Sequence, residues 1–183
     1  RNAQNGLAEG VSAGVFSLAR AFNGYAEVTS QSVTVNSAAA GSWGLTYNDN
    51  GQIATKSETV AGVTANYVYT YDGVGRLIQV EKDGAVVEQY GYNGANPLGI
   101  RTSEMNTLRG IPTRSLTYNT EDQLLSVGTT TYQYNADGFL WTKVNGANST
   151  TYNYSSRGEL LQVNLPDGRN IEYVHDPEGR RIA

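Results

Sequence analysis

The sequence predicts an all-β protein built as a repetitive ribbon of antiparallel β-hairpins, and three observations lead to this prediction. Tyrosine is unusually frequent, with 13 Tyr against 13 Lys+Arg in 183 residues. Glycine is abundant, with 21 residues, while charged residues make up only 16% of the chain. A short unit of two aromatics followed by a turn recurs along the chain. Disordered chains have high charge and few aromatics, so this composition indicates a folded, β-rich protein.

The recurring unit is clearest at residues 69–77, where it reads Tyr-Thr-Tyr-Asp-Gly-Val-Gly-Arg-Leu. Residues 132–140 and 152–160 repeat it closely, and weaker copies occupy 45–51, 90–96, 116–122 and 173–180. The second aromatic position falls at 47, 71, 92, 118, 134, 154 and 175, with His175 in the last copy. Self-similarity at a period of about 20 residues is typical of repeat architectures.

The chemistry of the unit is that of a turn between two strands. Tyr-x-Tyr places two rings on one face of a strand, because strand side chains alternate. Asp or Asn next accepts a hydrogen bond from the backbone two residues on, which starts a type I turn. Gly three residues later supplies a positive φ, and Asn96 or Asp122 holds this position where Gly is missing. The motif residues with the clearest match are Tyr69, Tyr71, Asp72, Gly75, Arg76, Tyr134, Asn135, Gly138, Tyr154, Gly158, His175, Asp176 and Gly179.

A second class of turn alternates with the first. Asp83-Gly84, Asn145-Gly146 and Pro166-Asp167-Gly168 each fall between two aromatic units. Asn-Gly and Asp-Gly favour two-residue hairpins in which both central residues have positive φ. Ala61-Gly62 and Gly128 occupy equivalent gaps with weaker chemistry. The chain is therefore expected to run as a continuous meander of strands of about five to eight residues.

One spacing leaves two interpretations open. Leu and Val recur three residues apart after the turn, as in Leu77 with Val80 and Leu160 with Val163. A flat strand would place such a pair on opposite faces. Either both faces are partly covered, or a β-bulge shifts the alternation.

Two stretches are less regular than the rest. Residues 97–115 contain two Pro and two Gly and are expected to form an irregular insertion, either an extended hairpin or a loop. Residues 1–44 carry no clean copy and are interpreted as a degenerate N-terminal repeat or a linker. The expected organisation is therefore about seven hairpin repeats over residues 45–183, after this first segment.

The copy at residues 71–77, Tyr-Asp-Gly-Val-Gly-Arg-Leu, resembles the consensus of the RHS, or YD, repeat family. The resemblance runs from about Trp43 to the C-terminus and implies a hairpin ribbon that spirals as a segment of a larger hollow β-shell. Bacterial shells of this family enclose a toxin domain, and related repeats occur in wall-associated proteins and teneurin-type receptors. The motif Arg is present only at Arg76 and Arg180, and no counterpart of the segment that closes family shells is found. We therefore expect a segment of a longer chain.

The resemblance implies a non-enzymatic structural segment of a secreted or cell-surface bacterial shell that encloses or delivers a toxin or effector. Its partners would be further repeats of the same polypeptide and the enclosed domain. The alternative is an extracellular adhesion or carbohydrate-binding module that recognises surface glycans. In that alternative, exposed rings of Trp43, Tyr132, Tyr134 and Trp141 form platforms for sugars. Repetition of Tyr at one position favours stacking between hairpins instead.

Several classes of function are disfavoured by composition. A net charge of −4 offers no basic field for nucleic acid, and no apolar window approaches the roughly 18 residues of a membrane span. The absence of Cys excludes thiolate chemistry and Cys-ligated zinc. His175 is the only His and is expected to fill the aromatic position of its repeat. The acidic residues fall mainly in turns, so we predict no catalytic residue, metal site or cofactor.

Overall fold

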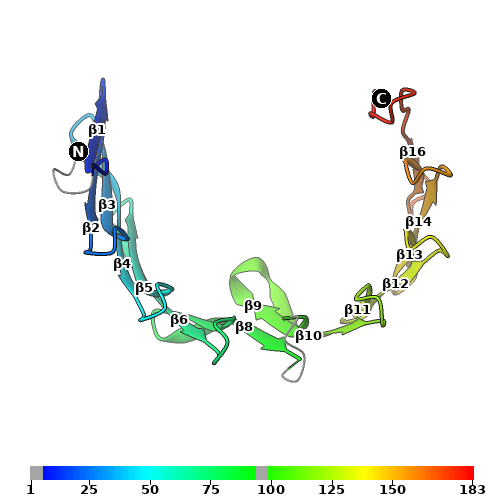
Figure 1. Ribbon diagram of the computed structural model, residues 1–183, viewed down its shortest axis with the longest axis horizontal. Helices are drawn as coiled ribbons and strands as arrows, with labels where there is room; N and C mark the ends of the chain where they lie inside the picture. The colour runs from blue at the N-terminus through cyan, green and yellow to red at the C-terminus, as the bar shows by residue number, and fades with distance from the viewer. Residues whose placement is uncertain (1–5, 94–98) are drawn as a thin grey trace. The chain divides into compact units, whose positions relative to one another are not determined.

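The computed structural model describes residues 6–93 and 99–183 (Figure 1). Within these residues the chain forms sixteen strands and one short 3-10 helix, and the strand order is the chain order. The all-β prediction is therefore confirmed. The chain divides into two compact units, which are described separately. Unit 1 comprises residues 1–91 and 105–112, and unit 2 comprises residues 92–104 and 113–183. The expected turn residue Asn96 lies outside the described residues.

Unit 1 is a meander in which each strand pairs antiparallel with the next, as the alternation of turns predicts. Its strands are β1 (Gly10–Ala13), β2 (Phe16–Phe22), β3 (Val28–Val35), β4 (Ala38–Tyr47), β5 (Ile53–Val60), β6 (Val63–Tyr71), β7 (Leu77–Lys82) and β8 (Ala85–Tyr92). Residues 10–44 therefore contain strands throughout, joined by the same kinds of turn as the later repeats.

Unit 2 continues the same construction, again with antiparallel neighbours. Its strands are β10 (Ile111–Tyr118), β11 (Leu124–Val127), β12 (Thr130–Tyr134), β13 (Leu140–Asn145), β14 (Asn148–Tyr154), β15 (Leu160–Asn164) and β16 (Asn170–Glu172).

In the described part of 97–115, β9 (Arg101–Asn106) precedes the 3-10 helix η1 (Thr107–Arg109). The Asn106 side chain caps η1 by accepting a hydrogen bond from the Arg109 N–H, and Gly110 ends it at φ 66°.

In the described residues a β-bulge follows the turn of five of the seven aromatic units, and a sixth bulge of this kind follows residues 23–27. The bulge explains the Leu–Val spacing. Tyr71 pairs with Leu77, whereas Thr70 pairs with Gln79, so Ile78 is an extra residue. Cross-strand partners share a face, so the bulge returns Val80 to the face that carries Leu77 and the Tyr side chains. Of the two interpretations left open, the bulge is the correct one. The extra residues in the six bulges of this kind are Thr29, Ala54, Ile78, Leu125, Trp141 and Leu161.

Two of the three buried apolar side chains in the described residues lie opposite the first aromatic of a unit, and the third is Val87 in β8. Val80 is 4% exposed and pairs with Tyr69, and Val163 is 7% exposed and pairs with Tyr152. Each ring thus covers a β-branched side chain across the strand, a pairing that contributes roughly 0.2–1 kcal/mol. The core of each unit is a thin layer along the aromatic face, as expected for repeats that bury their surface on neighbours.

The two-residue turns follow the prediction in part. Asp83-Gly84 and Ala61-Gly62 have positive φ at both central residues, as type I′ turns require. The prediction for Asn145-Gly146 is wrong, because Asn145 pairs with Asn148 and only Gly146 among the turn residues has positive φ. Gly at the first central position is the requirement of a type II′ turn, so Gly146 and Ala147 form the turn instead.

The prediction of a tight hairpin at Pro166-Asp167-Gly168 is also wrong. The turn there spans five residues, since the Leu165 N–H donates to the Arg169 carbonyl and the Gly168 N–H donates to the Leu165 carbonyl. The physical reason lies in Pro166, whose ring holds φ near −65° and cannot adopt a positive value. Pro therefore favours the first central position of a type I turn, and Gly168 takes the left-handed position two residues later.

Candidate functional site

One five-residue turn recurs eight times in the described residues, and we call it the long turn. The N–H of its first residue donates to the carbonyl of the fifth, as Asp72 does to Arg76 at 2.9 Å. The N–H of its fourth residue donates to the carbonyl of the first, as Gly75 does to Asp72 at 3.0 Å. The long turns span residues 23–27, 48–52, 72–76, 119–123, 135–139, 155–159, 165–169 and 176–180.

The fourth residue of every long turn has a positive φ, between 60° and 85° in all eight. Six of these residues are Gly, whereas Ala26 and Asp122 adopt the conformation in spite of their side chains. The long turn at 23–27 was missed from the sequence because Ala26 stands where Gly is expected. The signal that could have found it is Phe22-Asn23, an aromatic followed by Asn.

In the seven long turns that begin with Asp, Asn or Ser, the side chain of the first residue accepts hydrogen bonds from the backbone of the turn. Asp72 Oδ1 accepts from the backbone N–H groups of Val74 and Arg76 at 3.1 and 2.9 Å, and Oδ2 accepts from Arg76 Nε at 2.7 Å. The backbone N–H of Arg76 is the largest cause that lowers the pKa of Asp72 below its usual value. Asp176 has the same arrangement with Arg180, and the backbone N–H of Arg180 lowers the pKa of Asp176.

In six of the eight long turns the first and fifth side chains form a hydrogen-bonded pair, and the exceptions are 135–139 and 165–169. Asp72 pairs with Arg76, Asn48 Nδ2 donates to Gln52 Oε1 at 3.1 Å, and Ser155 Oγ donates to Glu159 Oε2 at 2.7 Å. Asn119 pairs in the same way with Gln123, and Asn23 with Glu27. Gln52 and Glu159 were departures from the motif Arg, yet each is the hydrogen-bond complement of its own first residue. The two positions therefore vary together for a chemical reason.

The fifth side chain also meets the next long turn. Gln52 Nε2 donates to the Gly75 carbonyl at 2.6 Å, and Gln123 Nε2 donates to the Gly138 carbonyl at 3.1 Å. Phe139 lies so close to Gly158 that a Cβ on this glycine would stand 2.6 Å from Phe139 Cζ. We call the resulting column of long turns within each unit the turn spine. It comprises residues 23–27, 48–52 and 72–76 in unit 1 and 119–123, 135–139, 155–159 and 176–180 in unit 2.

The second aromatic provides another link between repeats. Tyr71 Oη donates to the Ile53 carbonyl at 2.9 Å, and Tyr47 and Tyr134 donate likewise to the carbonyls of Val28 and Leu124. Each acceptor is the residue that follows the preceding long turn of the spine. The Tyr154 ring instead stacks on Phe139 with centroids 5.1 Å apart. Desolvation raises the pKa of the hydroxyls of Tyr47, Tyr71, Tyr118, Tyr134 and Tyr154.

His175 occupies the second aromatic position of its copy. It forms an isolated β-bridge with Arg181, just beyond the long turn 176–180. Its Nδ1 is buried and has no hydrogen-bond partner among the described residues. The imidazole ring of His175 has no hydroxyl group. His175 therefore lacks the donor that Tyr47 and Tyr71 use to form a hydrogen bond with a backbone carbonyl.

Trp43, one of the predicted sugar platforms, belongs to unit 1 and is engaged with its neighbours. Its Nε1 donates to Glu58 Oε1 at 3.0 Å, and its ring lies over Gly41, where a Cβ would stand 3.1 Å from Cη2. Glu58 in turn pairs with Lys56 at 2.9 Å, and Lys56 Nζ lies 4.4 Å from the centre of the Tyr67 ring. The side-chain hydrogen bond from Lys56 is the largest cause that lowers the pKa of Glu58.

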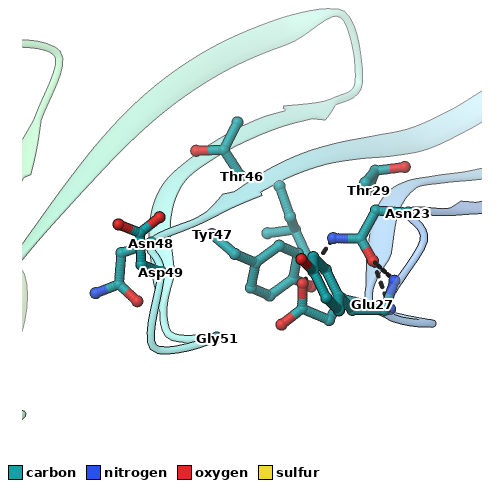
Figure 2. A pocket seen from close by; sticks show the side chains of 10 residues that line it. Asn23, Glu27, Thr29, Thr46, Tyr47, Asn48, Asp49 and Gly51 are labelled. Carbon is teal, nitrogen blue, oxygen red and sulfur yellow. Dashed lines mark hydrogen bonds between the residues drawn. The ribbon is translucent and has the colours of Figure 1, made fainter.

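A hollow lies between successive long turns in each unit. In unit 1 it has a volume of about 720 Å³, and Figure 2 shows Asn23 and Glu27 on one side with Tyr47 and Asn48 across from them. In unit 2 a hollow of about 610 Å³ lies between the turns 135–139 and 155–159. Tyr134 and Trp141 line this second hollow, whereas Tyr132 is half-buried in β12 and does not line it. Trp141 is 53% exposed on its bulge.

No three His, Cys, Asp or Glu side chains in residues 6–93 and 99–183 are grouped closely enough to hold a metal ion. The same part of the chain contains no helix with the length and apolar character that a membrane crossing requires. The polar groups of the repeated motif are engaged in the hydrogen bonds of the long turns, so the arrangement holds one repeat to the next.

Known proteins share this architecture. The family model of the teneurin YD-shell matches residues 1–183. Teneurin-3 of Danio rerio is 32% identical over 143 residues, which cover 76% of this chain and 5% of that protein. Double-stranded DNA deaminase toxin A of Burkholderia cenocepacia (strain H111) is 30% identical over 132 residues, covering 63% of this chain and 9% of the toxin.

Among solved structures, TcdB2-TccC3 without its hypervariable C-terminal region superimposes with a TM-score of 0.67 at 15% identity, a likeness of fold. The match covers 91% of this chain and 11% of that one, so the chain spans about a tenth or less of the relatives it matches. The match over all 183 residues, together with the repeated long turn, identifies the chain as a structural YD-repeat segment that belongs to the teneurin YD-shell family.

Proposed function

We propose that the shell to which this segment contributes encloses and delivers a toxin or other effector domain, and that the segment itself is a non-catalytic part of the wall. The observation that carries the proposal is the turn spine. In each unit the fifth side chain of one long turn is fitted to the glycine of the next, as Gln52 is to Gly75. Such nearest-neighbour joints build an extended wall, because each repeat buries its surface on the repeats beside it.

The way in which the polar side chains are used supports the non-catalytic role. Asp72 and Ser155 each accept hydrogen bonds from turn backbone and pair with the fifth residue, so their oxygen atoms are engaged. A catalytic group needs a reacting atom within hydrogen-bond reach and a pKa suited to proton transfer. The lowered pKa of Asp72 results from these turn hydrogen bonds, which are structural.

The relatives support a toxin as the cargo. One of them is a double-stranded DNA deaminase toxin, and the solved structure of similar fold lacks a hypervariable C-terminal region. In this proposal the partners of the segment are further repeats of the same polypeptide and the enclosed domain. The whole protein is then secreted or displayed at the cell surface.

The test is protection of the cargo in the full-length protein that carries this segment. The full-length protein is treated with proteinase K, and digestion of the cargo domain is followed with and without prior denaturation of the shell. We expect the native shell to delay digestion at least tenfold. A double variant, Gly75→Val with Gly158→Val, breaks the spine in both units and is expected to abolish the delay.

The matched control is Gly62→Val with Gly84→Val, since a Cβ at either glycine meets no atom within 4 Å. This control should keep most of the protection. Digestion of the cargo in the native wild-type protein as fast as in the denatured protein would contradict enclosure. Retention of the effector activity by a variant that lacks the cargo domain but keeps residues 1–183 would contradict the non-catalytic role.

A further inference from the structure

We propose that Asn145 is a site of spontaneous covalent modification, at which the side-chain amide is lost as ammonia and the residue becomes isoaspartate or aspartate. The reaction needs an Asn whose following backbone nitrogen can attack the side-chain carbonyl carbon. Gly is the residue that hinders this attack least, because it has no side chain. Asn is among the residues that are chemically labile on heating. Residues 145–146 have the required sequence, and their surroundings in the fold leave the reacting groups accessible.

The attacking group is the backbone nitrogen of Gly146, and the turn leaves it open. Gly146 is the first central residue of the two-residue turn between β13 and β14, with φ 58°. Its N–H has no hydrogen-bond acceptor among the described residues. A Cβ placed on Gly146 would meet no atom within 4 Å. The nitrogen therefore has neither a hydrogen bond to break nor a neighbour that blocks the approaching side chain.

The side chain of Asn145 is free to turn toward this nitrogen. Asn145 is exposed at the end of β13. Its side chain has one hydrogen bond in the described part of the chain, in which Oδ1 accepts from Thr129 Oγ1 at 3.4 Å. A hydrogen bond of this length is weak, so it does not fix the side chain. The carbonyl carbon Cγ can therefore reach the attacking nitrogen.

Two other Asn-Gly pairs lie wholly within residues 6–93 and 99–183, and both are held by the hydrogen bonds of long turns. The Asn23 Oδ1 atom accepts from two backbone N–H groups of its turn at 3.0 Å each, and Nδ2 donates to Glu27 Oε2 at 2.6 Å. The N–H of Gly51, which follows Asn50, donates to the first carbonyl of its turn at 2.9 Å. One pair thus has its side chain engaged and the other its nitrogen, so the fold singles out residues 145–146.

The atoms of the reaction balance with water as the co-reactant. A solvent base removes the proton from the Gly146 nitrogen, which then bonds to Cγ of Asn145. The Cγ–Nδ2 bond breaks, and ammonia leaves after taking a proton from solvent. Water opens the resulting cyclic imide. Opening at Cγ gives aspartate, whereas opening at the backbone carbonyl carbon gives isoaspartate, in which the main chain runs through Cβ and Cγ.

The product disturbs the sheet where three strands meet. Asn145 pairs with Thr130 of β12 and with Asn148 of β14. Isoaspartate adds one methylene to the main chain at this point, which displaces both pairings. Because register determines which face each side chain occupies, the change loosens the hairpin on both sides. The modification therefore weakens unit 2 as the protein ages, whether or not the shell encloses a cargo.

The first test incubates the full-length protein in mildly alkaline buffer, with and without urea, and follows each Asn-Gly pair by peptide mapping and mass spectrometry. In the native protein we expect Asn145 to convert at least tenfold faster than Asn23 or Asn50. In urea the three rates should agree within threefold, because the turns are lost. The rate should rise with pH, since the attacking nitrogen must lose its proton. Conversion of Asn145 no faster than that of Asn50 in the native protein, or a tenfold preference that persists in urea, would overturn the proposal.

The second test compares hydrogen exchange in fresh and aged full-length protein. Aged wild-type protein should lose protection of the β13 and β14 amides, whereas Asn145→Gln should keep it, because the longer side chain closes the ring far more slowly. The matched control is Asn50→Gln, an exposed position in a long turn, which should age as the wild type does. An equal loss of protection in aged Asn145→Gln, or unchanged protection in wild-type protein whose Asn145 has converted, would overturn the proposed weakening.

Discussion

The side-chain amide of Gln52 donates a 2.6 Å hydrogen bond to the backbone carbonyl of Gly75, 23 residues further along the chain. Gln52 is the fifth residue of one long turn, and Gly75 is the fourth residue of the next. A Cβ on Gly75 would stand 3.2 Å from the Nε2 atom of Gln52. Glycine is favoured at this contact for two reasons: it adopts a positive φ without strain, and it has no Cβ to crowd the Gln52 amide.

Replacing Gly158 by Ala should destabilise unit 2 by about 3 kcal/mol. The left-handed conformation costs an L-residue about 1–2 kcal/mol, and overpacking adds about 1–3 kcal/mol, because the new Cβ would stand 2.6 Å from Phe139 Cζ. The measurement is the loss of hydrogen-exchange protection in the amides of β13 to β15. Gly84→Ala, at φ 80° in open space, should cost only the conformational part. Equal effects of the two substitutions would contradict the packing argument.

Replacing Gln52 by Ala should lower the free energy of unfolding by about 2 kcal/mol. The substitution removes the donor to the Gly75 carbonyl and the acceptor of Asn48 Nδ2, so these two polar groups lose the hydrogen bonds that Gln52 makes with them. Chemical denaturation monitored by tyrosine fluorescence measures the change. The control is Gln89→Ala, whose side chain makes one exposed 3.4 Å hydrogen bond to Gln79 and should change stability by less than about 0.5 kcal/mol.

Replacing Tyr71 by Phe should cost about 1 kcal/mol while leaving the fold intact. The ring is preserved, but its hydroxyl no longer donates to the Ile53 carbonyl at 2.9 Å. Tyr152→Phe is the matched control, because the Tyr152 hydroxyl has no hydrogen-bond partner among the described residues. Thermal unfolding of both variants gives the comparison. A cost at Tyr152 as large as at Tyr71 would show that the repeat-to-repeat hydrogen bond is not the source of the effect.

We expect the free energy of unfolding to fall at alkaline pH, relative to its value at neutral pH. Burial raises the pKa of Tyr47, Tyr71, Tyr134 and their counterparts in the folded state, which favours the neutral phenol there. Their contribution to stability is therefore complete below about pH 10, where unfolded Tyr titrates, and is lost as the pH rises through the folded pKa values. Denaturant midpoints from pH 8 to pH 12, with phenolate absorbance recorded alongside, measure this. A flat midpoint above pH 10 would contradict it.

The local features of the ribbon could be predicted from the sequence because they depend on residues close together in the chain. Asp72 and Gly75 specify their turn through an Asx hydrogen bond and a positive φ. The turn can therefore be predicted from these residues alone, without the contacts between repeats. The alternation of Tyr69 and Tyr71 likewise places two rings on one face. The prediction at Pro166 was wrong for an equally local reason. Proline cannot adopt the positive φ of a two-residue hairpin and favours a five-residue turn instead.

The sequence by itself determined the all-β class, the repeat and the position of most turns. The tertiary structure decided that Ile78 and Trp141 are extra residues in bulges, that Trp43 is engaged while Trp141 is exposed, and that Gln52 reaches Gly75. The reason is physical, since register and contacts between repeats depend on how strands distant in sequence align. Turn propensity depends on a few adjacent residues, whereas these alignments are a property of the whole sheet.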